Sequence, residues 1–171
     1  DIDLNVYVQS TGALYNTPGD NTDATGHYQI VVADGTYIIR FRSTLPGQRW
    51  VPIEITNVTI TNDTTINTSM VSGYFLSGTV RNQALAPVFD VDLDVVVPAT
   101  SQVIVTPSDN TDAAGFYQLL IPAGVFDLQV EPFAATKLVP KESLSVLINA
   151  DKTIDFVLQS GFLISGIVSA A

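Results

Sequence analysis

Hydrophobic and polar residues alternate along most of this chain, in short runs that are separated by turn residues. Alternation with a period of two is typical of half-buried β-strands, and no segment sustains the 3.6-residue period of a helix. The clearest run sets four apolar side chains against three carboxylates: Val91, Leu93, Val95 and Val97 against Asp90, Asp92 and Asp94. Further apolar faces are predicted at Tyr28, Ile30 and Val32; Tyr37, Ile39 and Phe41; Tyr117, Leu119 and Ile121; Phe126, Leu128 and Val130; and Ile154, Phe156 and Leu158. Many short strands between turns predict an all-β sandwich.

The sequence contains an internal duplication, in which the second copy follows the first after about 90 residues. The matching segments are 1–6 with 90–95, 18–29 with 107–118, 51–52 with 139–140, and 72–73 with 160–161. A period of this length is too long for one solenoid turn and suits a small domain. We therefore predict two tandem domains, residues 1–72 and 73–160, followed by residues 161–171.

The two copies differ at their start. The second copy opens with a strand-like segment, Leu76–Val80, whose counterpart in the first copy would have to precede Asp1. A segment of the same pattern, Ile164–Val168, follows the second copy. We predict that the first sandwich lacks its opening strand. Residues 161–171 are then either the opening strand of a next repeat or a strand donated to another molecule.

Four motifs of the second copy resemble the carboxypeptidase-regulatory-like family, one of the transthyretin-like (prealbumin-like) β-sandwiches. They are Ser77–Val80, Thr111–Tyr117, Pro122–Phe126 and Ile154–Leu158. The resemblance covers nearly the whole chain and extends to collagen-adhesin B-type (Cna-B-like) repeats. It implies two tandem seven-stranded Ig-like sandwiches that serve as a spacer, stalk or accessory module of secreted and surface proteins, without catalytic residues of their own.

The adhesin repeats also imply a test for covalent cross-links, because related repeats join a first-strand lysine to a late Asn or Asp. The first copy contains no lysine. The second copy has only Lys137, Lys141 and Lys152, none of them in its opening strand. We therefore expect no intramolecular isopeptide bond.

Charge and composition narrow the class of partner. The chain has 17 acidic and 7 basic residues, for a net charge of −10 at pH 7. Such a surface repels phosphate backbones, so nucleic acid is not an expected partner. No apolar run reaches the roughly 18 residues of a membrane helix. The absence of cysteine excludes disulfides and thiolate metal sites.

Catalysis is not expected. The only histidine, His27, alternates opposite Tyr28 and aligns with Phe116. A Ser-His-Asp arrangement would need that histidine, and the chain has no Gly-x-Ser-x-Gly nucleophile elbow. We interpret His27 as an exposed strand residue.

Two acidic turns are candidates for calcium, the one cofactor that the sequence suggests. Residues 21–26 place oxygen ligands at alternate positions before a glycine, as calcium loops do. The candidate ligands are Asp20, Asn21, Asp23 and Thr25 in the first copy, and Asp109, Asn110 and Asp112 in the second. Neither turn has the glutamate that such loops carry at position twelve. The alternative is a hairpin turn whose Asp and Asn side chains bond their own backbone.

The carboxylate row Asp90, Asp92 and Asp94 also allows several interpretations. Side chains at i and i+2 lie roughly 7 Å apart on one strand face. A paired-carboxylate glycosidase site would need an apolar wall that raises one pKa, and the sequence supplies none. The preferred interpretation is a solvated sheet face, and the alternative is a weak cation site or a contact between domains.

Two further features concern sugars. Three sequons begin at Asn57, Asn62 and Asn67, all placed outward or in a turn, so they are candidate glycosylation sites if the source cell modifies asparagine. The sole tryptophan, Trp50, aligns with Leu138. A sugar-binding module would stack a ring on such a residue, whereas a core or interface role is more typical.

The leading hypothesis is a non-catalytic structural protein, extracellular or on the cell surface, in the manner of a spacer, stalk, adhesion protein or filament subunit. An open sandwich edge invites β-strand addition. Head-to-tail addition would make a filament of identical subunits. The alternative explanation of the missing strand is that the chain is cut between repeats of a longer protein. The strand for it would present Phe162, Ile164, Gly166 and Val168. The alternative is an accessory carbohydrate- or protein-binding module.

Overall fold

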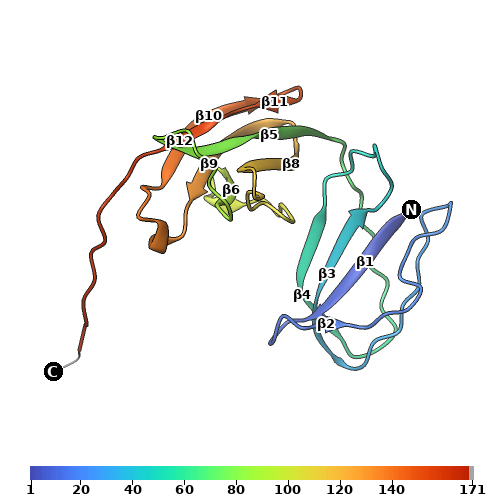
Figure 1. Cartoon of the computed structure of the whole chain (residues 1–171). Helices are drawn as coiled ribbons and strands as arrows, with labels where there is room; N and C mark the ends of the chain where they lie inside the picture. The colour runs from blue at the N-terminus through green and yellow to red at the C-terminus, as the bar shows by residue number, and fades with distance from the viewer. Residues whose placement is uncertain (170–171) are drawn as a thin grey trace. The chain divides into compact units, whose positions relative to one another are not determined.

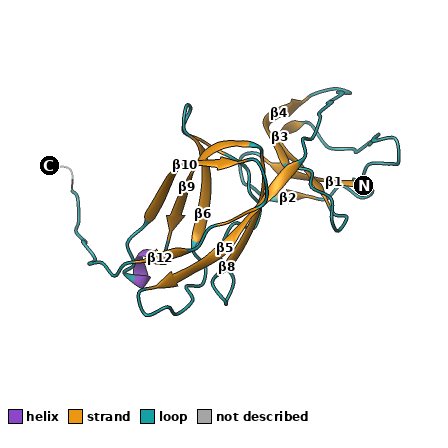
Figure 2. Ribbon diagram, turned by 90° about the horizontal axis from the view of Figure 1, so that it is seen from above, coloured by secondary structure: helices purple, strands orange, loops and turns teal. Residues whose placement is uncertain are grey.

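The structure, a computed structural model, describes residues 1–169 and consists of strands and loops with one short 3-10 helix (Figures 1 and 2). The predicted all-β class is confirmed. The chain divides into two compact units, Asp1–Gly73 and Tyr74–Ala171. Unit 1 contains the first copy of the sequence repeat, and unit 2 contains nearly all of the second copy together with the residues that follow it. Each unit is described by itself below.

Unit 1 contains one antiparallel sheet in the order β2-β1-β3-β4. Its strands are β1 (Ile2–Val8), β2 (Leu14–Tyr15), β3 (Gly35–Ser43) and β4 (Ile53–Ile60). In the ladder between β1 and β3, Leu4 pairs with Phe41. Alternation puts both side chains on the inner face, where they form a small core with Ile39.

Unit 2 contains two sheets. The first, in the order β10-β9-β6-β7, comprises β6 (Asp92–Val97), β7 (Gln102–Val103), β9 (Gly124–Glu131) and β10 (Lys141–Ile148). The second is organised around β5 (Gly73–Asn82), which pairs with β8 (Phe116–Pro122) and, in parallel, with β11 (Lys152–Thr153) and β12 (Phe156–Leu158). The 3-10 helix η1 (Ala134–Thr136) lies between β9 and β10.

The core of unit 2 is filled by the inward side chains of both sheets, as alternation predicts. Leu76 and Val80 of β5 pack with residues of β6, β8, β9 and β12 in one buried cluster. The apolar faces predicted for β6, β8, β9 and β12 are confirmed, with Ile154 partly buried beside them. Each fully buried Leu, Ile or Phe contributes roughly 1.5–3 kcal/mol, so this unit has the larger apolar stabilisation.

Corresponding hydrogen bonds relate the two units. The amide of Thr22 donates to the carbonyl of Ile2, and the amide of Thr111 donates to that of Val91, both at 2.9 Å. The hydroxyl of Tyr28 donates to the carbonyl of Ile66 at 2.7 Å. The hydroxyl of Tyr117 donates to the carbonyl of Ile154 at the same distance. The duplication is therefore structural as well as sequential.

One prediction for unit 1 is wrong. Tyr28, Ile30 and Val32 were expected to form a strand like their counterparts in β8, but residues 27–33 form none. Residues 63–70, the counterparts of β11 and β12, form none either. The physical reason is that β8, β11 and β12 take their ladder partners from β5, and the described part of unit 1 has no equivalent of β5.

Candidate functional site

The main candidate site is the part of unit 1 that corresponds to the second sheet of unit 2. It is bounded by residues 27–33 and 63–70, which we call the flanking segments. The bond from the Tyr28 hydroxyl to the Ile66 carbonyl joins them. In unit 2, the backbone of β5 runs against the corresponding bond. A Cβ added to Gly78 would lie 1.8 Å from the Ile154 carbonyl oxygen and 3.0 Å from the Tyr117 ring. The flanking segments of unit 1 therefore make the same Tyr–Ile bond that lies against β5 in unit 2. Within the described residues, no strand lies against this bond in unit 1.

Two glycines at equivalent turns show the same difference. A Cβ on Gly115 would lie 2.5 Å from the carbonyl oxygen of Val80, in β5. A Cβ on Gly26, its counterpart in unit 1, would have nothing within 4 Å. Space that β5 occupies in unit 2 is thus open in unit 1.

The apolar side chains of the flanking segments are correspondingly under-buried. The inward residues of β8, Tyr117, Leu119 and Ile121, are buried, whereas their counterparts in unit 1, Tyr28, Ile30 and Val32, are only half-buried. Burial still raises the pKa of the Tyr28 phenol. Covering these side chains with another strand would remove apolar surface from water, which is favourable.

The segment after β12 has the sequence pattern of β5 but none of its contacts. We call residues 162–168 the tail strand because they repeat the sequence pattern of β5. In this structure they form no strand and extend away from unit 2 as a loop (Figures 1 and 2). Phe162, Ile164 and Val168 are 100%, 95% and 101% exposed. Leu76 and Val80, which correspond to Ile164 and Val168, are both 0% exposed. These exposed apolar residues at strand spacing make the segment a candidate interaction surface.

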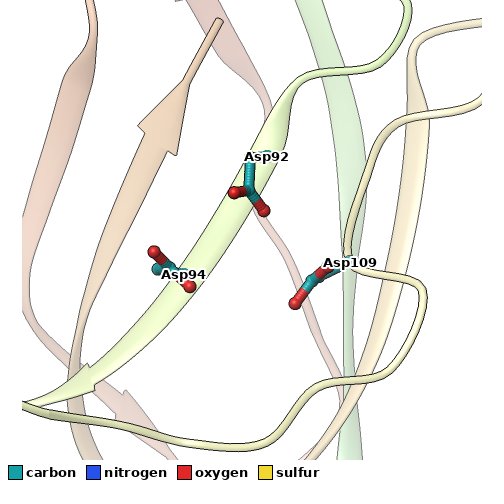
Figure 3. Close-up of side chains that lie close together, drawn as sticks. All are labelled: Asp92, Asp94 and Asp109. Carbon is teal, nitrogen blue, oxygen red and sulfur yellow. The ribbon is translucent and has the colours of Figure 1, made fainter. Parts of the chain in front are cut away.

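A second candidate is a cluster of three carboxylates in unit 2. Asp92 and Asp94 project from β6, and Asp109 reaches them from the loop before β8 (Figure 3). Their nearest oxygens lie within 4.8 Å of one another. Partial burial, together with the charge of Asp109, raises the pKa of both Asp92 and Asp94. Clusters of acidic groups near a protein surface are common without an ion, so the cluster alone does not define a metal site.

The corresponding sheet face of unit 1 carries arginines that balance its carboxylates, whereas the carboxylates of the cluster in unit 2 repel one another. There, Arg42 of β3 donates from Nε to the Asp3 carboxylate at 2.9 Å, and Arg40 pairs with Glu54. Arg40 also stacks over Tyr7, 4.7 Å from the ring centroid. In unit 2, Glu131 takes the place of Arg42 opposite Asp92. The second copy has therefore lost the cations that balance this face.

We expect Glu131→Arg to stabilise unit 2 at pH 7 by about 0.5 kcal/mol, because it recreates the cross-strand pair of unit 1 in a largely solvated position. Folding raises the pKa of Asp92 and Asp94 above 3.8. The folded state consequently binds more protons than the unfolded state just above that value, and stability falls as the pH rises through this window. Urea unfolding at pH 4.5 and pH 7 measures the effect.

The control for this prediction is Glu142→Arg, which makes the same charge change on β10 of the same sheet, outside the cluster. Glu131→Arg should flatten the pH dependence of stability between these two pH values, and Glu142→Arg should flatten it less. Equal effects of the two variants would show that net charge, rather than the cluster, determines the dependence.

The predicted calcium turns hold their carboxylates in turn-closing bonds. The Asp23 Oδ1 accepts from the amides of Thr25 and His27 and from the Thr25 hydroxyl. These bonds lower the pKa of Asp23, and the bond from the Thr25 hydroxyl contributes most to the lowering. Asp112 accepts from the amides of Ala114 and Phe116 in the same way.

The remaining predicted ligands bond to several different partners. Asp20 and Asp109 each accept a bond from a threonine hydroxyl three residues earlier. Asn110 donates to Asp90. Asp109 joins Asp92 and Asp94 rather than Asp112. Alternation along the chain could not predict the approach of Asp109 to Asp92 and Asp94, since that approach depends on the path of a loop. Calcium binding at the turns stays a prediction.

The other predicted residues lie at the surface. Asn57, Asn62 and Asn67 are exposed, as their sequons require, and Asn57 has a φ of 57°. His27 is exposed. Trp50 is 40% exposed, so it is not a core residue, and it lies at an isolated bridge to Ser72; an interface role and sugar binding stay predictions. The Nζ of Lys152 donates to the Leu147 carbonyl, and Lys141 lies over the Phe156 ring.

Within residues 1–169, no helix is long and apolar enough to cross a membrane. No family model matches the sequence. No curated protein sequence matches it either. The resemblance to the carboxypeptidase-regulatory-like family therefore stays a prediction.

Solved structures with some similarity to the chain include a shaft pilin and a cohesin–dockerin complex. The shaft pilin SpaA of Lactobacillus rhamnosus GG is 8% identical over 96% of this chain and 89% of that chain, with a TM-score of 0.38. A type II cohesin-X-dockerin complex from Acetivibrio cellulolyticus is 18% identical, with a TM-score of 0.36. That match covers 50% of this chain and 57% of the other. Neither function nor detailed fold follows from similarities this low.

Proposed function

We propose that the protein is a non-catalytic structural module of the cell surface or extracellular space, and that its molecules join by β-strand donation. The tail strand of one molecule would pair with the flanking segments of unit 1 in the next. One observation carries this proposal: the position that β5 fills in unit 2 is open in unit 1. The tail strand repeats the sequence pattern of β5 and could fill it.

Burial and backbone bonding would both favour this assembly. The tail strand exposes apolar side chains at alternate positions, and the flanking segments leave the apolar side chains that would cover them only half-buried. Strand addition supplies main-chain hydrogen bonds for affinity and side-chain positions for specificity. It would give unit 1 the two-sheet core that unit 2 has within its own chain.

Donor and acceptor are different surfaces of the molecule, so the contact is heterologous. A heterologous contact that does not close into a ring extends as a linear polymer. Every unit 1 in such a polymer would contain a strand from its neighbour, and every unit 2 its own β5. This arrangement suits a filament or stalk.

Truncation after Gly161 tests the proposal. The tail strand makes no contact with the core of unit 2, so the truncated protein should have the same far-UV circular dichroism and thermal stability of unit 2. We expect the full chain to form oligomers that grow with concentration in sedimentation velocity, and the truncated chain to remain monomeric. A full chain that is strictly monomeric at millimolar concentration would contradict the proposal.

A further inference from the structure

Alternation alone does not fix how the tail strand would sit. Phe162, Ile164, Gly166 and Val168 share one face, so a slip of two residues would keep the apolar face inward. A slip of one residue would turn that face to solvent and is excluded. The remaining registers differ in which inward residue lies against the Tyr28–Ile66 bond.

Only glycine fits beside this bond, because it has no Cβ. In unit 2, the inward residue beside the Tyr117–Ile154 bond is Gly78, where a Cβ would lie only 1.8 Å from a backbone oxygen. The equivalent bond in unit 1 joins Tyr28 to Ile66. The tail strand has one inward glycine, Gly166. The neighbouring Gly161 has the opposite parity, so placing it there would turn the apolar face outward.

We infer that strand donation occurs in a single register, with Gly166 of one molecule against the Tyr28–Ile66 bond of a second copy. This inference rests on the proposed strand donation. Ile164 and Val168 then take the buried positions that Leu76 and Val80 hold in unit 2.

The pairing follows from the parallel ladder of unit 2. There, Leu76 pairs with Lys152, Ser77 with Thr153, and Val80 with Phe156. The equivalent pairs between two molecules are Ile164 with Thr64, Ser165 with Thr65, and Val168 with Thr68. Because the amide of Ile154 donates to the Ser77 carbonyl, the amide of Ile66 would donate to the Ser165 carbonyl of the neighbour.

Cysteine cross-linking tests the register, because the natural chain has no cysteine. A full chain with Ser165→Cys is mixed with a full chain of different tag size that carries Thr65→Cys, and the pair is oxidised. We expect a disulfide-linked heterodimer as the main product. A single chain with Ser77→Cys and Thr153→Cys is the positive control, since it places the same pair of positions within unit 2.

Two-residue slips are tested with Asp63→Cys and Asn67→Cys in place of Thr65→Cys. We expect at least tenfold less heterodimer from either. If one of them cross-links best while truncation after Gly161 abolishes assembly, the register is overturned and strand donation stands. If none cross-links above a random mixture and truncation has no effect, both proposals fall.

Gly166→Val gives an independent readout in the uncross-linked full chain. A valine at this position would meet the Ile66 carbonyl, so assembly should weaken by at least 100-fold in concentration. Ser165→Val adds a side chain of the same size on the outward face and should leave assembly within about threefold of the natural chain. Equal assembly of the two variants would overturn the inference.

Discussion

Gly78→Ala should unfold unit 2 or reduce its free energy of unfolding by about 3 kcal/mol or more, the upper range for inserting atoms into a packed interior. The added Cβ would lie 1.8 Å from the Ile154 carbonyl oxygen and 2.7 Å from its carbon. Both are backbone atoms, which cannot swing aside as a flexible side chain would. The conflict also involves Tyr117, whose phenol pKa burial raises.

Urea unfolding followed by circular dichroism measures this loss, while the fluorescence of Trp50, the only tryptophan, reports unit 1 separately. The matched control is Gly166→Ala, because a Cβ there has nothing within 4 Å and should leave the monomer unchanged. A Gly78→Ala protein as stable as the natural one would refute the close approach of β5 on which the description of the open sheet depends.

A synthetic peptide of residues 161–168 should stabilise unit 1 of the protein truncated after Gly161. A ligand that binds only the folded state at 100 times its dissociation constant adds about 2.7 kcal/mol. For a unit of this size, that corresponds to a rise in Tm of roughly 10–20 °C. Thermal unfolding followed by Trp50 fluorescence measures the shift.

The same peptide with Gly166→Val is the control, since it keeps the apolar face but carries a Cβ at the Tyr28–Ile66 bond. It should raise the Tm little or not at all. The Tm of unit 2 should not change, because β5 already fills the corresponding position there. A natural peptide that leaves the Tm of unit 1 unchanged at millimolar concentration would contradict strand addition.

The sequence predicted the all-β class and most inward residues, because alternation depends on local geometry that each strand carries by itself. It failed at residues 27–33, which have the same alternation as β8. The two segments differ in their surroundings, since β8 has β5 as a ladder partner. A pattern of side chains specifies which face is apolar, but a strand forms only where backbone partners are present.

The sites show the same division between local and distant information. The bonds that close the turn at Asp23 join neighbouring residues, and turn chemistry anticipated them. The approach of Asp109 to Asp92 and the bond from Tyr28 to Ile66 join residues that are far apart in sequence. The only sequence feature that pointed to the bond from Tyr28 to Ile66 was the alignment of Tyr28 with Tyr117. This alignment is informative only when the bond from Tyr117 to Ile154 in unit 2 is known.

Hydrogen exchange on the full chain tests the central claim most directly, measured by mass spectrometry at dilute and at high protein concentration. Strand donation predicts that amides of residues 28–33, 64–69 and 162–168 become protected together as the concentration rises, while protection of β5 stays constant. Contradiction would come from a tail strand that exchanges freely at every concentration, or from protection of all three segments already present in the dilute monomer.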